Sequence, residues 1–459
     1  MCALVGLTGV LGCARAGDAL APELRARADT AVRTVLARTG VPSASIALVR
    51  HHALVYANAY GWAELEPRRA ATPAMRYAIG SISKEFTAAA LLLLQEDGRL
   101  SIDDPAGKWV TGLGPAAAAS IHSLLSHTAG IRDYWPQDYD PPDMLKPVNA
   151  AEIVRRWANQ PLDFPTGTAW QYSNTGYVVA GMIAEKAAGE PLIRFLRERI
   201  FVPLRMTRVF DFDAAPLPAG DASGYTRYAL GPPRLAAKEG RGWLFAAGEL
   251  AMTASDLALW DIALIERRLL SDASYKDLTT EVRLENGAGS SYALGLDVLL
   301  ESGRRVLKHE GEVGGFTAEN RIYPDDGIAI VVMTNEDATD ASSAIADTLA
   351  QLLLASNSPA DAAAIADAQH LFSELQSGHI DPARLTPNAR SYFSAQAVAD
   401  FAASLGPLGK PVTFTLTRAG PRGGLITRVY AVSFPNEKLH AVVRSTPDGL
   451  IEQYTVSAE

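Results

Sequence analysis

The sequence predicts an α/β protein in which helices flank an antiparallel sheet, with a mostly helical subdomain inserted within that sheet and a small α+β domain at the C-terminus. Three observations lead to this prediction. Strand-like segments occur near the N-terminus and again after residue 291, whereas the long stretch between them is mostly helical or loop-like. After a Ser/Pro-rich linker, two helix-like segments precede a series of strands.

The first elements are a helix over residues 23–38, which Gly40 ends, and two strands over residues 44–49 and 53–60. Residues 83–265 follow as the mostly helical middle portion. These N-terminal strands need partners, and the middle portion does not supply them.

The partners come later in the chain. Strands are expected over residues 292–300 and onwards to the apolar segment 328–333, with a turn at residues 324–327. Residues 342–354 then form a closing helix. We therefore expect the early and late strands to build one sheet, with a cleft between its edge and the helical subdomain.

The domain boundaries follow from these elements. We expect a leader over residues 1–21, a main domain over 22–355, a linker over 356–360 and an accessory domain over 361–459. The last of these has helix-like stretches followed by strands that turns separate, an arrangement similar to the cone-shaped nuclear-transport-factor-2-like fold.

The composition excludes several classes of function. The 459 residues are 48% hydrophobic and carry a formal charge of −9, without a basic patch of the nucleic-acid-binding kind. Only two cysteines occur, Cys2 and Cys13, so the body of the protein has no disulfide framework and no zinc-thiolate site. The signatures H-E-x-x-H and G-x-S-x-G are absent. We expect no metal, no cofactor and no nucleic-acid partner.

The N-terminus is typical of an exported protein. Residues 3–11 form an apolar run that is too short to span a bilayer but fits a signal-peptide core. Ala14-Arg-Ala16 fits a cleavage site, whereas Val10-Leu-Gly-Cys13 resembles a bacterial lipobox, which would make Cys13 a lipidated N-terminus. The sequence predicts a periplasmic or secreted protein, or a lipoprotein attached to the membrane through Cys13, and it does not decide between these.

A serine and a lysine stand three apart in Ser81-Ile-Ser-Lys84, just ahead of the apolar run 88–94. Three residues is close to one helical turn, so the two side chains share a helix face. A lysine whose pKa is lowered by burial could accept the serine proton, and the Ser81 N–H could donate to an oxyanion. The motif indicates an active-site serine, although S-x-x-K arises by chance about once in a chain of this length and helix caps also favour serine.

Two further motifs carry polar groups suited to the same chemistry. In Tyr172-Ser-Asn174 the tyrosine could be a general acid/base if a cation lowers its pKa, and the asparagine amide could orient a substrate or the lysine. In His309-Glu-Gly-Glu312 the histidine lies on an expected strand. Gly311 would let a substrate approach the strand backbone, and the Glu312 N–H could then donate to the oxyanion. Each motif also has a purely structural reading.

Together these motifs resemble the serine β-lactamase and penicillin-binding protein superfamily, on its class C side. That group includes D-alanyl-D-alanine carboxypeptidases, D-aminopeptidases and β-lactamase-like esterases. S-x-x-K is a signature of the superfamily, and residues 96–105 and 124–131 are also similar to family members. The resemblance covers about residues 25–355 and implies the β-lactamase/transpeptidase-like fold. Within it, His127 is expected to be a structural hydrogen-bonding residue near the site.

The resemblance also implies roles for matching residues. Ser81 becomes the acylated nucleophile, Lys84 its proton acceptor and Tyr172 the acid/base for leaving group and water. Asn174 becomes a contact for the substrate amide and for Lys84. The backbone N–H groups of Ser81 and Glu312 become the oxyanion hole.

His309 departs from the family pattern, because many members have there the lysine of Lys-Thr-Gly, which helps to hold the substrate carboxylate. A neutral histidine would hold a carboxylate less firmly, and Glu310 and Glu312 add negative charge. We therefore expect a serine hydrolase for a small ester or peptide/amide substrate without a mandatory anionic group, D-amino-acid and peptidoglycan-derived peptides included. The alternatives are a class C-type β-lactamase or D-Ala-D-Ala carboxypeptidase, and a non-catalytic homologue that binds cell-wall material.

Overall fold

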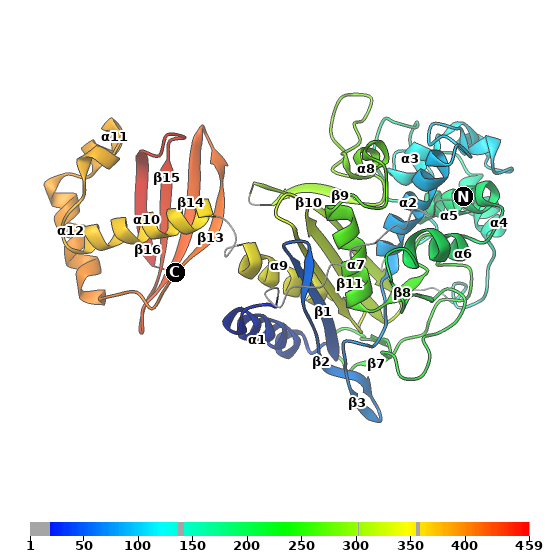
Figure 1. The fold of residues 1–459 in the computed structure, drawn as a ribbon, viewed down its shortest axis with the longest axis horizontal. Coiled ribbons are helices and arrows are strands. Elements are labelled where there is room, and N and C mark those ends of the chain that lie inside the picture. The colour runs from blue at the N-terminus through cyan, green and yellow to red at the C-terminus, as the bar shows by residue number, and fades with distance from the viewer. Residues whose placement is uncertain (1–18, 136–141, 302, 355–358, 459) are drawn as a thin grey trace, which may run out of the picture.

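A seven-stranded antiparallel sheet forms the centre of the larger part of the molecule (Figure 1). The computed structural model describes residues 19–135, 142–301, 303–354 and 359–458. In spatial order the strands are β3 (Arg68–Ala70), β2 (Ala53–Leu65), β1 (Ser43–Arg50), β12 (Ile328–Thr334), β11 (Phe316–Tyr323), β10 (Arg304–Val313) and β9 (Asp297–Glu301). The early strands thus pair directly with the late ones through β1 and β12, as the sequence predicted.

One face of this sheet is covered by the first and last helices of the larger part. Side chains alternate along β1, so that Ile46 and Leu48 point to the same face. There they join a buried apolar cluster with α1 (Pro22–Thr39) and α9 (Ala341–Leu354). This cluster fastens the two ends of the region to each other.

The opposite face of the sheet packs against the helices α2 (Ser83–Glu96) and α7 (Ala254–Ile265). Ala47 and Val49 of β1 point there and join a second, larger cluster that includes both helices. Residues 83–94 of α2 are buried on every side of the helix, which explains the unbroken apolar run in its sequence. The helix that carries the candidate catalytic lysine is therefore held rigidly within the core.

The inserted portion is mostly helical, as expected, with short strands between its helices. Its other α-helices are α3 (Ile121–Leu125), α4 (Ala150–Ile153), α5 (Asn174–Ala188), α6 (Leu192–Leu196) and α8 (Asp272–Thr279). The short strands are β4 (Tyr77–Ala78), β5 (Phe210–Asp211), β6 (Tyr225–Thr226), β7 (Arg234–Leu235) and β8 (Leu250–Met252). Strands β4, β8 and β5 form a small sheet that supports the segment leading into α2.

The C-terminal part has a four-stranded antiparallel sheet and an apolar cluster of its own. Its elements are α10 (Pro359–Gln376), α11 (Pro387–Tyr392), α12 (Ala395–Leu405), β13 (Thr413–Arg422), β14 (Leu425–Ser433), β15 (Lys438–Ser445) and β16 (Ile451–Ala458). The strands lie in sequence order, and Phe372 of α10 packs on Phe414 and Phe434 from the strand region. Figure 1 shows the two parts as separate lobes.

Two expected elements have other bounds in the structure, and one helix was not expected. The strand expected over residues 292–300 begins only at Asp297, because Gly295 adopts a left-handed φ of 80° and lies against the carbonyl of Lys84. Helix α10 begins at Pro359, inside the segment expected to be a linker and ahead of the expected boundary at residue 361. Helix α11 was not expected.

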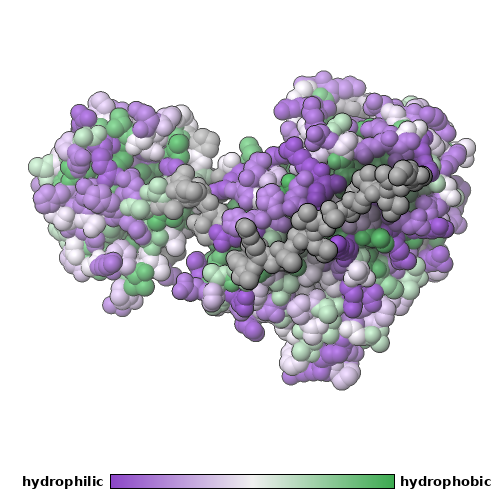
Figure 2. Space-filling view, in the orientation of Figure 1, coloured by the Kyte–Doolittle hydropathy of each residue, from purple (hydrophilic) through white to green (hydrophobic). Residues whose placement is uncertain are grey.

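The surface and the termini add little to the fold. On the face seen in Figure 2, hydrophilic and hydrophobic residues are interspersed over both parts. None of the helices within the described residues combines the length and apolar character needed to cross a membrane. The expected leader, with Cys13 and the Ala14–Ala16 cleavage motif, lies outside the described residues.

Candidate active site

Ser81 and Lys84 are brought together where a 3-10 turn runs into α2. Ser81 lies in the turn Gly80–Ile82, and α2 begins two residues later at Ser83. The Nζ atom of Lys84 is 2.9 Å from Oγ of Ser81. Lys84 is fully buried, and this burial lowers its pKa to about 7, against an opposing effect of the Asp133 charge. Near neutral pH a large share of Lys84 is thus an uncharged amine able to accept the hydroxyl proton.

Lys84 is fixed by two further contacts. Its Nζ atom donates to Oδ1 of Asn174 at 2.8 Å and to the carbonyl oxygen of Ala247 at 2.8 Å. Together with Ser81 these atoms match the three donors of a protonated lysine. When Lys84 loses a proton, its two remaining N–H groups still donate to Asn174 and Ala247. The nitrogen lone pair then faces Ser81.

Asp133 is a site residue that the motifs did not reveal. Its carboxylate accepts hydrogen bonds from the backbone N–H of Asn174 at 2.9 Å and from Nδ2 of Asn174 at 3.1 Å. The second bond turns the amide so that Oδ1 faces Lys84. Burial raises the pKa of Asp133, and the backbone N–H of Trp135 and the Lys84 charge oppose this shift. Asp133 therefore positions both Asn174 and, through it, Lys84.

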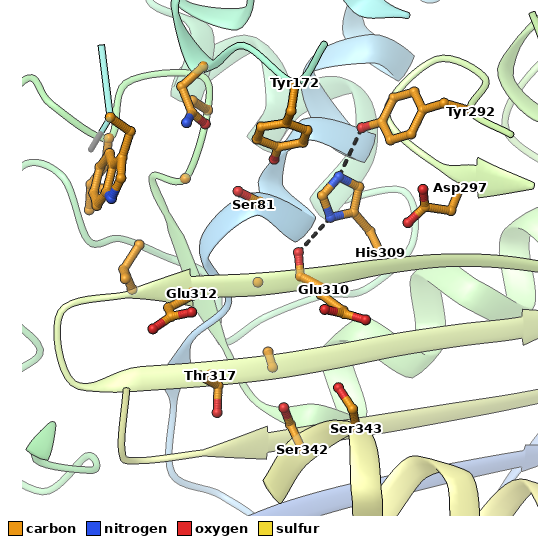
Figure 3. A pocket seen from close by; sticks show the side chains of 18 of the residues that line it. Ser81, Tyr172, Tyr292, Asp297, His309, Glu310, Glu312, Thr317, Ser342 and Ser343 are labelled. Carbon is orange, nitrogen blue, oxygen red and sulfur yellow. Dashed lines mark hydrogen bonds between the residues drawn. The ribbon is translucent and has the colours of Figure 1, made fainter. Parts of the chain in front are cut away.

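Tyr172 faces Ser81 across the cleft, with its hydroxyl directed towards the serine (Figure 3). The Nζ atom of Lys84 lies 4.9 Å from the centre of the Tyr172 ring. The sequence suggested a general acid/base if a cation lowers the pKa of Tyr172, and this condition is not met. Desolvation raises that pKa well above its ordinary value, while the interaction with Ser81 opposes the shift. Tyr172 is thus a proton donor at neutral pH rather than a resting phenolate.

His309 lies on β10 at the same cleft, buried and hydrogen-bonded at both ring nitrogens (Figure 3). Nδ1 lies 2.5 Å from the carbonyl oxygen of Glu310, so this nitrogen carries the hydrogen. Nε2 then accepts from the hydroxyl of Tyr292 at 2.9 Å. Burial and the nearby Lys84 lower the pKa of His309 to about 3, so the imidazole is neutral. A neutral ring without a spare donor cannot replace a lysine as a carboxylate anchor.

Gly311 has a different role from the one the sequence suggested. The expectation was close approach of a substrate, but the backbone of the Ser81 segment occupies that space. A Cβ atom at position 311 would lie 1.9 Å from the carbonyl oxygen of Ile79, and one at Gly80 would lie 2.6 Å from the backbone nitrogen of Glu312. The two missing side chains allow β10 and the serine turn to pack backbone against backbone. This places the N–H groups of Ser81 and Glu312 on adjoining segments, where an oxyanion hole requires them.

His127 packs against the side chains of the site and holds the segment that carries Tyr172. Its Nδ1 atom accepts from the backbone N–H of Ser173 at 3.1 Å, so Nε2 carries the ring hydrogen. The ring packs against those of Tyr172 and Tyr292, with centres 4.3 and 4.8 Å away. Burial lowers its pKa well below the ordinary value. His127 is a neutral, structural residue, as expected from the sequence.

Ser81, Tyr172, Asn174 and His309 line a cleft of about 420 Å³. Tyr134, Trp135 and Trp170 form an aromatic wall, and Asp297, Glu310 and Glu312 bring carboxylates. None of the described residues that line the cleft is a lysine or an arginine. Residues 142–301, 303–354 and the other described ranges also contain no group of three or more His, Cys, Asp or Glu side chains suited to a metal ion.

Asp133, Tyr292 and Asp297 were missed because no short motif marks them. Asp133 follows directly after the family-like segment 124–131, and proximity to that segment is the one signal that could have found it. Tyr292 and Asp297 pair across a turn where a continuous strand over residues 292–300 was expected. Asp213 supports the cleft indirectly, because its carboxylate accepts from the backbone N–H of Leu244, a residue that lines the cleft.

Comparisons with known proteins agree on one family. The family model described as Beta-lactamase matches residues 28–355. Penicillin-binding protein 4* of Bacillus subtilis is 31% identical over 300 residues, covering 62% of this chain and 66% of that protein. A D-aminopeptidase of Brucella anthropi is 27% identical over 319 residues, covering 67% of this chain and 58% of that protein. The chain thus spans less than two thirds of the length of either relative.

Among solved structures, an octameric penicillin-binding protein homologue from Pyrococcus abyssi superposes with a TM-score of 0.64. The match covers 94% of this chain and 99% of that one at 21% sequence identity. At this identity the likeness concerns the fold. The architecture expected from the sequence, an antiparallel sheet flanked by helices in the β-lactamase/transpeptidase manner, is confirmed.

Proposed function

Because the chain belongs to the Beta-lactamase family, we propose that it is a serine hydrolase that cleaves a small ester or peptide/amide bond through an acyl-enzyme on Ser81. The observation that carries this proposal is the 2.9 Å contact between Ser81 Oγ and Nζ of a buried lysine whose pKa is about 7. Burial makes the charged form of Lys84 costly, and this brings its pKa to about 7, close to the value that a general base needs at neutral pH.

Acylation begins with proton transfer from Ser81 to uncharged Lys84 as Oγ attacks the substrate carbonyl carbon. Negative charge develops on the carbonyl oxygen, towards which the N–H groups of Ser81 and Glu312 can donate. Tyr172 holds its proton at neutral pH and can give it to the departing alkoxide or amine. The proton on Lys84 then passes to the Tyr172 phenolate, which restores both groups.

In deacylation water is the nucleophile, and Lys84 rather than Tyr172 takes its proton, because Tyr172 is protonated at neutral pH. Water attacks the carbonyl carbon of the Ser81 ester, and its proton passes to Lys84. The Ser81 oxygen leaves and takes this proton back, which releases the carboxylic acid product and the free enzyme. No step requires a metal ion or a cofactor.

The cleft favours substrates without an obligatory carboxylate. His309 is neutral and engaged at both nitrogens, and three carboxylates line the cleft without a described lysine or arginine among its lining residues. An esterase or peptidase therefore fits better than a β-lactamase, although the family name keeps the latter as the second candidate. The similarity to a D-aminopeptidase supports amide bonds of D-amino acids, peptidoglycan-derived peptides included, as substrates to test. The N-terminal sequence adds export from the cytoplasm to this proposal.

Pre-steady-state hydrolysis of a short-chain 4-nitrophenyl ester tests the proposal. We expect a burst of about one 4-nitrophenol per protein, absent in Ser81→Ala. Ser45→Ala is the matched control, because Ser45 is a buried serine on β1 whose hydroxyl has no hydrogen-bond partner among the described residues. A burst that persists in Ser81→Ala would contradict the acyl-enzyme assignment.

A further inference from the structure

A tight turn before β9 brings two cleft residues side by side. Tyr292 and Asp297 form an isolated antiparallel bridge, and the backbone N–H of Ala293 donates to the carbonyl of Leu296 at 2.8 Å within the turn. Gly295 closes it with a left-handed φ of 80°. In Figure 3, Tyr292 reaches His309 from this turn and the Asp297 carboxylate lies beside the same ring. The backbone therefore fixes a carboxylate at the end of the cleft next to His309.

The Asp297 carboxylate accepts no hydrogen bond from any described residue, although it is half-buried. Lys308 faces it on the neighbouring strand, but Nζ of Lys308 bonds Oε1 of Glu310 at 3.1 Å and lies 3.8 Å from Glu319. Arg321, the other cation of this group, is bound to Glu319 and to Asp347. The single positive charge of Lys308 is thus shared among Glu310, Glu319 and Asp297 and cannot neutralise all three carboxylates.

The negative charge at this end is present at neutral pH. Burial raises the pKa of Asp297 to about 6, with Lys308 opposing the shift and Glu310 adding to it. The charge of Asp297 in turn contributes to the raised pKa of Tyr172 and of Tyr292, which shows that it acts within the site. Asp297 is therefore largely ionised above pH 7.

The remaining cleft does not balance this charge. Glu310 and Glu312 are exposed at its edge, and no lysine or arginine occurs among its described lining residues. The cation nearest to the nucleophile, Lys84, is buried and partly uncharged. A cleft walled by protein and lined by one sign of charge concentrates ligands of the opposite sign.

We propose that Asp297 and Glu310 form a subsite for a positively charged group of the substrate, a primary ammonium such as a free amino terminus or an amine side chain. The subsite deepens the proposed function and rests on it, since it selects among substrates of Ser81. An ammonium has three N–H donors, and the Asp297 carboxylate accepts no hydrogen bond from any described residue, so the two groups suit each other. A substrate carboxylate at this place would meet like charge.

Three 4-nitrophenyl esters that differ only in ending in an ammonium, a methyl or a carboxylate group test the subsite. We expect the wild-type protein to prefer them in that order in kcat/KM. Asp297→Asn and Glu310→Gln should each lower the ammonium-to-methyl ratio about tenfold, as the loss of one charge-assisted hydrogen bond would. Because the ratio is taken within each variant, an effect of the substitution on the reaction itself cancels. Asp325→Asn, on the exposed turn after β11, is the control with the same charge change.

Binding to Ser81→Ala protein separates the subsite from the reaction. Calorimetry with the same three esters should give the tightest Kd for the ammonium compound, and this advantage should disappear when Asp297→Asn is added. Equal Kd values for the ammonium and methyl esters would overturn the subsite. If the wild-type protein turned over none of the esters while the ammonium preference in binding held, the subsite would stand and the proposed catalysis would fall.

Discussion

Gly311 of β10 and Ile79 of the serine turn touch backbone to backbone: a Cβ atom at position 311 would lie 1.9 Å from the Ile79 carbonyl oxygen. The segment that carries Ser81 can thus pack directly on β10 because position 311 has no side chain. No nearby flexible group could move to relieve the contact, because the obstructing atom belongs to the main chain.

Gly311→Ala should therefore separate β10 from the Ser81 turn. We expect kcat for a neutral ester to fall by at least tenfold and the free energy of unfolding to fall by about 1–3 kcal/mol, as for other overpacked sites. Gly420→Ala is the control, since a Cβ at that position in β13 meets no atom within 4 Å. Full activity in Gly311→Ala would show that this close approach does not set the site.

The pH dependence of activity should follow Lys84. The base form exists above the Lys84 pKa of about 7, so kcat/KM for a neutral ester should rise with pH through that value. Removing the Asp133 charge withdraws the effect that raises this pKa. Asp133→Asn should therefore move the acidic limb to lower pH and also lower the plateau, because Asn174 loses its fixed orientation.

The control for this shift is Asp163→Asn, which removes an exposed carboxylate that Arg132 and Gln171 contact outside the cleft. Its acidic limb should coincide with that of the wild-type protein. An acidic limb that moves to higher pH in Asp133→Asn would contradict the assignment of the limb to Lys84.

Stability should depend on pH through Glu85, the residue next to Lys84 in the sequence. Its carboxylate is fully buried, accepts from Nε1 of Trp260 at 2.7 Å and lies beside Asn320, which also bonds Asp261. Burial raises the pKa of Glu85 from 4.5 to about 8. Between these values the folded state binds the proton and the unfolded state does not, so the Glu85 contribution to the free energy of unfolding falls as pH rises.

Glu85→Gln removes this titration while keeping the shape of the side chain. Thermal unfolding from pH 5 to 9 should show that the variant loses less stability than the wild-type protein over this range. Exposed Glu23→Gln should follow the wild-type curve. Parallel curves for Glu85→Gln and wild type would contradict a proton held by Glu85.

The negative charge of β-lactam substrates should make them poorer substrates than neutral esters. Cephalosporins carry a carboxylate next to the reactive ring, and the cleft offers them Asp297, Glu310 and Glu312 with a neutral His309. We expect kcat/KM for a chromogenic cephalosporin to be well below that for a short-chain 4-nitrophenyl ester, measured under the same conditions. Faster turnover of the cephalosporin would make β-lactamase the leading function.

Local sequence patterns predicted much of the architecture and the residues around the nucleophile. Ser81 and Lys84 follow from helical spacing, and the antiparallel pairing of β1 with β12 follows from two apolar strands that needed partners. These features depend on short-range periodicity and on burial, which a sequence expresses directly.

The rest depends on contacts between segments far apart in the chain. Asp133 becomes a site residue only because its loop packs against the start of α5. Tyr292 and Asp297 both reach the cleft only because Gly295 turns the chain before β9. The pKa of Tyr172 also depends on such contacts. The Nζ atom of Lys84 lies over the Tyr172 ring, but desolvation by the surrounding fold has the largest effect on the pKa of Tyr172.

Activation of Ser81 as a nucleophile is tested most directly by the mass of the intact protein after treatment with a fluorophosphonate. We expect one adduct on Ser81, formed faster as the pH rises through about 7, and no adduct in Ser81→Ala. Ser45→Ala should react like the wild-type protein. A folded wild-type protein that forms no adduct, or forms it on another residue, would contradict the account.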